Sequence, residues 1–210
     1  YPLYHIKNSL MAKGMNSMVE HPKKIIFLTC DAFGILPAIS KLSSDQAMYH
    51  FISGYTAKVA GTERGITEPQ ATFSPCYGGP FLTLHPLIYA KLLKQKIEKY
   101  NVPVYLVNTG WIGGSASSGA KRISIKFTRQ MISSILDGNI EKAKYNRDSI
   151  FNLNIPINID GIPNDILNPR NSWQDKSLYD AKAIELANAF KENFNNYGDS
   201  VLYLKEFGPK

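Results

Sequence analysis

The chain has 210 residues, of which 44% are hydrophobic, so it can bury a core and does not have the composition of a disordered protein. Its apolar runs are only a few residues long, which excludes a membrane-spanning helix of about 20 residues, and no signal-peptide pattern opens the chain. The two cysteines, Cys30 and Cys76, are too few for a disulfide framework or a zinc knuckle, and they favour a cytoplasmic location.

The formal net charge is +7, from 24 Lys and Arg residues against 17 Asp and Glu residues. Such an excess can indicate a nucleic-acid-binding protein. The lysines, however, are scattered over 7–24, 91–99 and 142–144, mostly at helical spacing, and no nucleic-acid-binding motif accompanies them. We therefore expect neither nucleic acid nor a membrane as a partner.

Residues 24–29, KIIFLT, are apolar and rich in β-branched side chains, and they predict a buried strand. Ser43 and Gln46 have the spacing of a capping box, which predicts the start of a helix. Apolar residues then recur at the helical period as far as Val59, so we expect this helix to end at Gly61.

The rest of the chain alternates between predicted loops, strands and helices. In chain order, the sequence predicts a loop at 61–80, a short strand at 81–84, a helix from Pro86 to about Tyr100, a strand at 102–107, a helix from about 125 to 136 that stops at Gly138, an irregular crossing at 152–171, and a last helix at about 178–195. This order, without an internal repeat or a domain-scale linker, indicates a mixed α/β fold.

Several polar residues outside these elements resemble parts of known sites only superficially. Asp31 follows the first strand in Asp-Ala-Phe-Gly, one residue longer than the metal-binding Asp-Phe-Gly of protein kinases, so we expect it to cap a loop. The four histidines lack metal-ligand spacing, and His50 and His85 are expected to be structural. The sequence thus predicts no metal site.

The stretch 106–131 runs from a buried strand through a glycine- and serine-rich loop into a helix that we expect to begin near Ser124. Unpaired N–H groups and the positive dipole end of a helix start favour a phosphate or the polar edge of a heterocycle. Four glycines let the backbone approach a ligand closely, namely Gly110, Gly113, Gly114 and Gly119. The bend is therefore our candidate anion or nucleotide site.

This loop nearly has the spacing of a phosphate-binding P-loop. Gly114 and Gly119 fit the pattern G-x-x-x-x-G-K-[ST], but Ala120 is inserted before Lys121, and Arg122 replaces the magnesium-binding hydroxyl residue. One extra residue moves the lysine away from the β- and γ-phosphates. A stand-alone nucleotide-binding kinase with a variant P-loop remains an alternative, as does a surface loop without a ligand.

Long blocks of the sequence follow one another in the order of a known family. They are residues 25–86 (IIFLTCDAFG to FLTLHP), YLVNTGW at 105–111, KRIS at 121–124 within 119–140, and ILNPRNSW at 166–173. Together they resemble the C-terminal part of ATP-dependent phosphoenolpyruvate carboxykinase. The resemblance implies the nucleotide-binding part of that fold, a mixed sheet flanked by helices. It also implies a share in the conversion of oxaloacetate and ATP to phosphoenolpyruvate, carbon dioxide and ADP in gluconeogenesis.

The resemblance places three residues of this chain at the adenine and ribose of ATP. Arg122 and Ile123 match the family's nucleotide-contacting Arg-Ile pair, and Thr128 matches its threonine. A guanidinium can stack on a purine, an isoleucine can form an apolar wall, and a threonine hydroxyl can read a base edge. Without the family, a surface salt bridge for Arg122 and a core contact for Ile123 would be the ordinary explanations.

Two departures from the family pattern lie in the same segment. Ala120 stands where the family usually has glycine, which would restrict the loop if the position required a positive φ. Phe127 stands where an acidic residue or tyrosine is common, so it removes the acidic half of a cap with Ser124.

Residues 56–69 resemble the mobile lid that closes over the active site in this family. Thr62, Glu63 and Arg64 form its polar tip, and Gly65 is one of its expected hinges. Closure would exclude water and protect an enolate. A surface loop without a catalytic role is the alternative.

The resemblance also implies that much of the enzyme lies outside this chain. The family's phosphate-binding loop, metal ligands and most oxaloacetate contacts precede the counterpart of Tyr1, so we expect about two fifths of an enzyme, inactive alone and without a catalytic residue of its own. Residues 6–22 look like an irregular insertion. The expected ligands are ATP or ADP, oxaloacetate and phosphoenolpyruvate. Mg²⁺ and Mn²⁺ are expected to bind outside this chain. The expected protein partner is the N-terminal part of the same enzyme, and a homodimer is a further option. A basic, non-enzymatic binding module is the remaining alternative.

Overall fold

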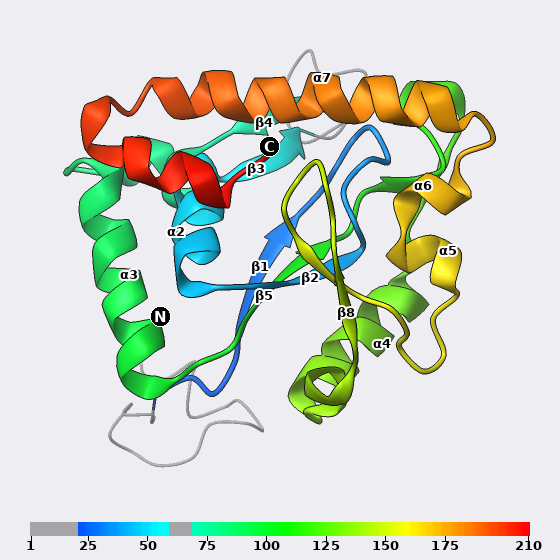
Figure 1. Cartoon of the computed structure of the whole chain (residues 1–210), viewed down its shortest axis with the longest axis horizontal. Coiled ribbons are helices and arrows are strands. Elements are labelled where there is room, and N and C mark those ends of the chain that lie inside the picture. Colours follow the sequence, from blue (N-terminus) through cyan, green and yellow to red (C-terminus); the bar gives the residue numbers. More distant parts are fainter. Residues whose placement is uncertain (1–20, 59–68) are drawn as a thin grey trace, which may run out of the picture.

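The computed structural model describes residues 21–58 and 69–210 and contains a five-stranded mixed sheet (Figure 1). β1 runs parallel to β5, whereas the other neighbouring strands are antiparallel. The strands, in their spatial order, are β1 (Ile25–Thr29), β5 (Val104–Asn108), β2 (Ile39–Leu42), β9 (Asn154–Pro156) and β8 (Tyr145–Arg147). The predicted mixed α/β fold, with a mixed sheet flanked by helices, is confirmed.

Every residue of β5 is buried, because this strand separates two hydrophobic cores. Val104 and Leu106 pack into one core, and Tyr105 and Val107 pack into the other. This alternation follows from the period of two in a strand, which sends successive side chains to opposite faces of the sheet. Helices must therefore cover both faces.

The larger core lies under three long helices. They are α2 (Ser44–Ser53), α3 (Pro86–Tyr100) and α7 (Lys176–Asn195), and a 3₁₀ segment at Asp199–Phe207 closes the same layer. In Figure 1, α7 runs along the top of the molecule and α3 descends at its left. Phe190 of α7 is fully buried among the rings of Tyr49, His50, Tyr55, Phe73 and Phe151.

The smaller core lies on the other face, under α4 (Ile125–Leu136). Met131 and Ile135 of this helix meet Tyr105 and Val107 of the sheet. Two short helices complete this side, α5 (Asn164–Leu167) and α6 (Pro169–Ser172). Within the two described ranges, no helix is long and apolar enough to cross a membrane.

The predicted start of α2 is confirmed, but its predicted end at Gly61 is wrong. Ser43 and Gln46 form the complete capping box. The helix stops at Gly54, which adopts φ 53° and lies so close to another segment that a Cβ would be 1.7 Å from the Ser74 carbonyl oxygen. Only glycine fits there, and the helix cannot continue.

The residues after Gly54 form a strand rather than the last turn of a helix. β3 (Tyr55–Lys58) pairs in antiparallel register with β4 (Gln70–Phe73), inside the stretch where we expected only a loop. The pairing of β3 with β4 determines the backbone here, although the apolar side chains after Gly54 continue a helical period.

Two other predictions are corrected. Residues 81–84 form no strand; Phe81 ends a 3₁₀ turn that begins at Gly79, and prolines at 80 and 86 limit backbone pairing. The stretch 152–171 is not wholly irregular, because β9 joins the main sheet beside β2. The strand predicted at 24–29, the helix at 86–100, the strand at 102–107, the helix at 125–136 and the last helix are confirmed within one or two residues.

His50 is buried in α2, only 3% exposed, and its Nε2 has no hydrogen-bond partner among the described residues. Burial lowers its pKa from 6.5 to about 4. Between pH 6.5 and 4, the unfolded chain binds a proton at this residue and the folded chain does not. The free energy of unfolding therefore decreases as the pH falls from 6.5 towards 4, by up to roughly 3 kcal/mol. We expect His50→Phe to flatten this acid branch in urea unfolding at pH 4 to 7. A loss of stability on acidification that is as steep in His50→Phe as in wild type would contradict the assignment.

Candidate functional site

The ends of β1 and β5 are joined by the buried side chain of Asn108. Its Oδ1 accepts hydrogen bonds from the N–H groups of Asp31 (3.0 Å) and Gly110 (2.8 Å), and its Nδ2 donates to the Leu36 carbonyl (3.0 Å). Asn108 thus fixes the point where the chain leaves the sheet for the glycine-rich loop.

Gly110 passes against the backbone of Asp31. A Cβ on Gly110 would lie 2.1 Å from the Asp31 carbonyl oxygen, and the same oxygen accepts the N–H of Trp111 at 2.9 Å. Any other residue at 110 would push the chain away, so the close approach requires glycine. The loop therefore starts from a rigid position.

The loop returns as a strand and not as a helix. β6 (Trp111–Ile112) pairs with β7 (Lys121–Arg122), and α4 starts only after its N-cap, Ser124. A P-loop instead leads from its strand through the glycines directly into a helix that carries the lysine. The geometry does not favour the variant P-loop. Ala120 is not among the residues with positive φ, so the alanine there does not strain the loop.

The short hairpin of β6 and β7 has two faces. Trp111 lies opposite Arg122, and Ile112 lies opposite Lys121. Because neighbouring residues of a strand point to opposite sides, Lys121 and Arg122 do not form one cationic cluster. Lys121 and Ile112 line a cavity of about 880 Å³ together with Phe33 and Trp173. Neither Arg122 nor Ile123 nor Thr128 lines that cavity.

Arg122 folds back onto the end of β1 and β5. Its Nε and Nη2 both donate to the Thr109 carbonyl oxygen, at 3.1 and 3.0 Å, and Nη2 lies 3.6 Å from the Cys30 sulfur. The guanidinium carbon lies 5.1 Å from the centre of the Trp111 ring. Burial raises the pKa of Cys30, although the charge of Arg122 opposes the rise, so this thiol stays protonated near neutral pH.

Ile123 and Thr128 flank the N-cap of α4. Ile123 is only 7% exposed and packs in the smaller core, while its N–H donates to the Gly110 carbonyl at 2.8 Å. Thr128 is half-buried, and its N–H donates to the Ser124 carbonyl at 3.0 Å. The Ser124 hydroxyl oxygen accepts the Phe127 N–H at 3.3 Å, and the phenylalanine side chain cannot return the bond.

The lid residues Thr62, Glu63, Arg64 and Gly65 lie outside the described residues. The strands on either side of them are described, and β3 is tied to the end of β1: the Tyr55 hydroxyl donates to Asp31 Oδ1 (2.8 Å), and the Thr29 hydroxyl donates to the Tyr55 carbonyl (2.7 Å). Of the insertion expected at 6–22, residues 6–20 also lie outside the described part. His21 stacks on Tyr100 with a ring separation of 3.7 Å.

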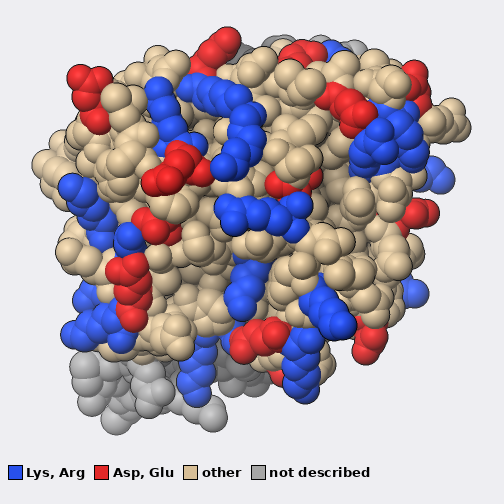
Figure 2. Space-filling model, viewed as in Figure 1, with Lys and Arg blue, Asp and Glu red and all other residues tan. Residues whose placement is uncertain are grey.

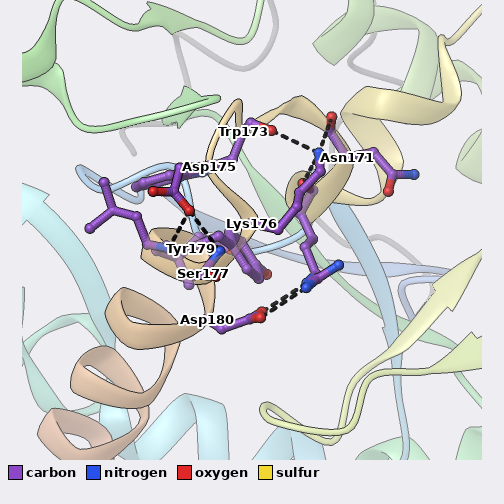
Figure 3. Close-up of polar contacts among 10 residues, drawn as sticks. Asn171, Trp173, Asp175, Lys176, Ser177, Tyr179 and Asp180 are labelled. Carbon is purple, nitrogen blue, oxygen red and sulfur yellow. Dashed lines mark hydrogen bonds and ion pairs between the residues drawn. The ribbon is translucent and has the colours of Figure 1, made fainter.

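A second cavity, of about 640 Å³, is lined in part by Arg170 and Asp180, which are paired with each other, and Figure 3 shows the polar contacts around the nearby start of α7. Arg170 donates two hydrogen bonds to Asp180, at 2.8 and 2.9 Å. Lys176 donates to three backbone carbonyls, and Asp175 caps the helix. This region stabilises the turn between α6 and α7.

Positive and negative side chains are interspersed over the face drawn in Figure 2. A nucleic-acid-binding surface would be expected to gather its lysines and arginines in one stripe.

Among the described residues, no group of three or more His, Cys, Asp and Glu side chains could hold a metal ion.

Sequence reasoning missed the residues that hold Arg122. Trp111, Thr109 and Cys30 precede the loop and come from two different strand ends. The one available indication was a tryptophan directly before the glycine-rich turn, which becomes meaningful only when the register of the hairpin is known.

Comparison with known proteins gives consistent matches. Residues 1–165 match the family model described as phosphoenolpyruvate carboxykinase. A relative from Caldanaerobacter subterraneus subsp. tengcongensis is 58% identical over 190 residues, covering 90% of this chain and 36% of the relative. Relatives from Campylobacter jejuni subsp. doylei and Staphylococcus aureus strain Newman are 56% and 50% identical, covering 100% and 99% of this chain and 40% and 38% of their own lengths. All three are named phosphoenolpyruvate carboxykinase (ATP).

Proposed function

The chain belongs to the ATP-dependent phosphoenolpyruvate carboxykinase family, and we propose that it is part of an enzyme that converts oxaloacetate and ATP to phosphoenolpyruvate, carbon dioxide and ADP in gluconeogenesis. It spans 36–40% of the length of the three relatives, so the reaction is proposed for the larger protein. In that protein this chain supplies the pocket for the adenine and ribose of ATP.

Arg122 is the principal residue of the proposed pocket. The observation that supports it is the guanidinium held over Trp111 by the Thr109 carbonyl, because an exposed planar cation is a suitable surface for a purine. Ile123 is buried, so we assign it the support of the pocket from the core side. Thr128 offers a hydroxyl to the base edge.

The proposed lid comprises residues 56–69, with Thr62, Glu63, Arg64 and Gly65 at its centre. The pairing of β3 with β4 supports this role, because it anchors both ends of a segment that must move without detaching. Closure would exclude water while decarboxylation forms an enolate and the phosphoryl group is transferred in line.

The family's metals, Mg²⁺ and Mn²⁺, do not fit the described residues, which hold no cluster of ligand side chains. Asp31, the most buried carboxylate of the region, has its four acceptor positions filled by protein donors. We therefore propose that the metals bind on other parts of the enzyme, where the family resemblance also implies most of the oxaloacetate contacts and the reacting phosphates. A cytoplasmic location is proposed because both cysteines are free thiols.

Arg122→Ala in the full-length enzyme tests the pocket. We expect ATP to bind at least about tenfold more weakly by calorimetric titration, because the purine loses its stacking surface, and turnover at limiting ATP to fall in parallel. Lys121→Ala is the matched control; its side chain points to the other face of the hairpin, and its loss should be milder. Unchanged affinity in Arg122→Ala would refute the proposed pocket, and loss of all phosphate affinity in Lys121→Ala would favour the variant P-loop.

A further inference from the structure

Arg122 is held by Thr109, Cys30 and Trp111, which so far have no role in the proposed nucleotide pocket. We propose that Trp111 is a positioning residue, which holds the plane of the Arg122 guanidinium in one orientation so that a purine base can stack on its open face. The inference rests on the proposed function of Arg122, and it names the residue on which the purine affinity of this pocket depends.

The Thr109 carbonyl alone cannot fix the guanidinium. It accepts from Nε and from Nη2, which directs one edge of the group towards a single oxygen atom. Two bonds to one atom leave the plane free to tilt about that atom. A free arginine side chain is also mobile and loses rotamer entropy when a ligand fixes it. The Cys30 sulfur, 3.6 Å away, meets the same Nη2 atom and so adds no contact with the face of the group. A second contact, on that face, must therefore set the plane.

Trp111 supplies this second contact. Its ring centre lies 5.1 Å from the guanidinium carbon, within the distance at which a cation is attracted to an indole face. The register of the hairpin puts the two residues directly opposite each other, so the contact is built into the backbone pairing.

The indole itself has little freedom. The main-chain N–H of Trp111 donates to the Asp31 carbonyl, which fixes the backbone. The indole ring packs against the small buried cluster of Cys30, Ala32 and Ala57. These residues come from the end of β1 and from β3. Trp111 is thus wedged between the core and Arg122, which is the arrangement expected of a support.

The remaining surface of Arg122 is available to a ligand. Nε and Nη2 face Thr109 and Cys30, whereas Nη1 has no hydrogen-bond partner among the described residues and can donate to ribose or base atoms. The side chain is exposed, so the guanidinium face away from the indole is open. A bound purine would complete a stack of indole, guanidinium and base.

The test compares ATP with inorganic tripolyphosphate, which carries the phosphates but no base. In the full-length enzyme, we expect Trp111→Ala to weaken ATP binding about tenfold and to raise the KM for ATP, with kcat and tripolyphosphate affinity unchanged. Trp111→Phe, which keeps an aromatic face, should restore most of the affinity. Ile112→Ala, on the opposite face of β6, should bind ATP normally. Adding Trp111→Ala to Arg122→Ala should cause no further loss, because the two residues act as one unit.

The possible failures are distinguishable. Normal ATP affinity in Trp111→Ala, with a loss in Arg122→Ala, would overturn the role of Trp111 and leave the pocket standing. Normal affinity in Arg122→Ala as well would overturn the proposed function itself. Equal losses for ATP and tripolyphosphate in Trp111→Phe would identify a merely structural tryptophan and overturn the inference.

Discussion

Replacement of Asp31 by alanine should destabilise the protein by on the order of 4 kcal/mol or more, because three buried donors and one partly buried donor lose their acceptor together. Oδ1 accepts from the Phe33 N–H (3.1 Å) and the Tyr55 hydroxyl (2.8 Å), and Oδ2 accepts from the N–H groups of Ile35 (2.5 Å) and Leu36 (2.8 Å). An unsatisfied buried donor costs about 1–3 kcal/mol.

Asparagine separates the effect of shape from that of the acceptors. Burial raises the pKa of Asp31, and the four donors oppose this rise. Asp31→Asn keeps one oxygen but points an NH₂ group at two donors, so its loss in urea unfolding should lie between wild type and Asp31→Ala. The exposed Asp165→Ala should change stability by less than about 0.5 kcal/mol. An Asp31→Asn variant as stable as wild type would show that the carboxylate does not hold the loop.

Phe190→Ala should cost about 3–5 kcal/mol, the range typical of a fully buried phenylalanine. Its ring is 0% exposed, 4.9 Å from the Tyr55 ring and 5.2 Å from the Phe73 ring, so the cavity would open between α7, β3 and β4. The rings around it come from α2, β3, β4 and the turn at Phe151, and they cannot all move into the space.

Urea unfolding measures this prediction against a control on the same helix. Ile184 is 55% exposed, so Ile184→Ala should stay within about 0.5 kcal/mol of wild type apart from helix propensity. Phe190→Leu, which fills part of the volume, should recover about half of the loss. A loss in Phe190→Ala no larger than in Ile184→Ala would mean that the aromatic cluster is not the centre of the core.

Elements with local chemical markers were predictable from the sequence. The capping box of Ser43 and Gln46 acts within one turn, and Pro86 fixes its own φ at a helix start, so neither depends on the rest of the fold. The apolar run at 24–29 is a strand because its β-branched and aromatic side chains favour an extended chain that pairs with β5, although β1 is an edge strand and Leu28 is exposed.

Elements that depend on distant partners were not predictable. The side chains after Gly54 continue a helical period, yet the backbone pairs with residues 70–73, and the Ser74 carbonyl blocks any longer helix. Residues 81–84 have a strand-like composition but find no neighbouring strand, whereas 154–156, in a stretch without a clear pattern, lie beside β2. Strand propensity is realised only where a partner lies alongside.

The candidate site divides in the same way. The glycine-rich bend and Arg122 could be found from spacing and family resemblance, whereas the separation of Lys121 from Arg122 requires the register of a two-residue strand. Trp111 could not be assigned, because its contact with Arg122 follows from the hairpin and not from its place in the sequence. The roles of Arg122, Ile123 and Thr128 remain predictions for the experiments above.

The parallel pairing of β1 with β5 bears on how the protein is made. Ile25 lies beside Val104, so nearly eighty further residues must be translated after β1 before its partner strand β5 exists. Closing a loop of this length before its contacts form is slow, and an apolar strand without a neighbour is prone to aggregate. Synthesis of this chain therefore includes an interval in which the strand IIFLT has been made and β5, its parallel partner, has not.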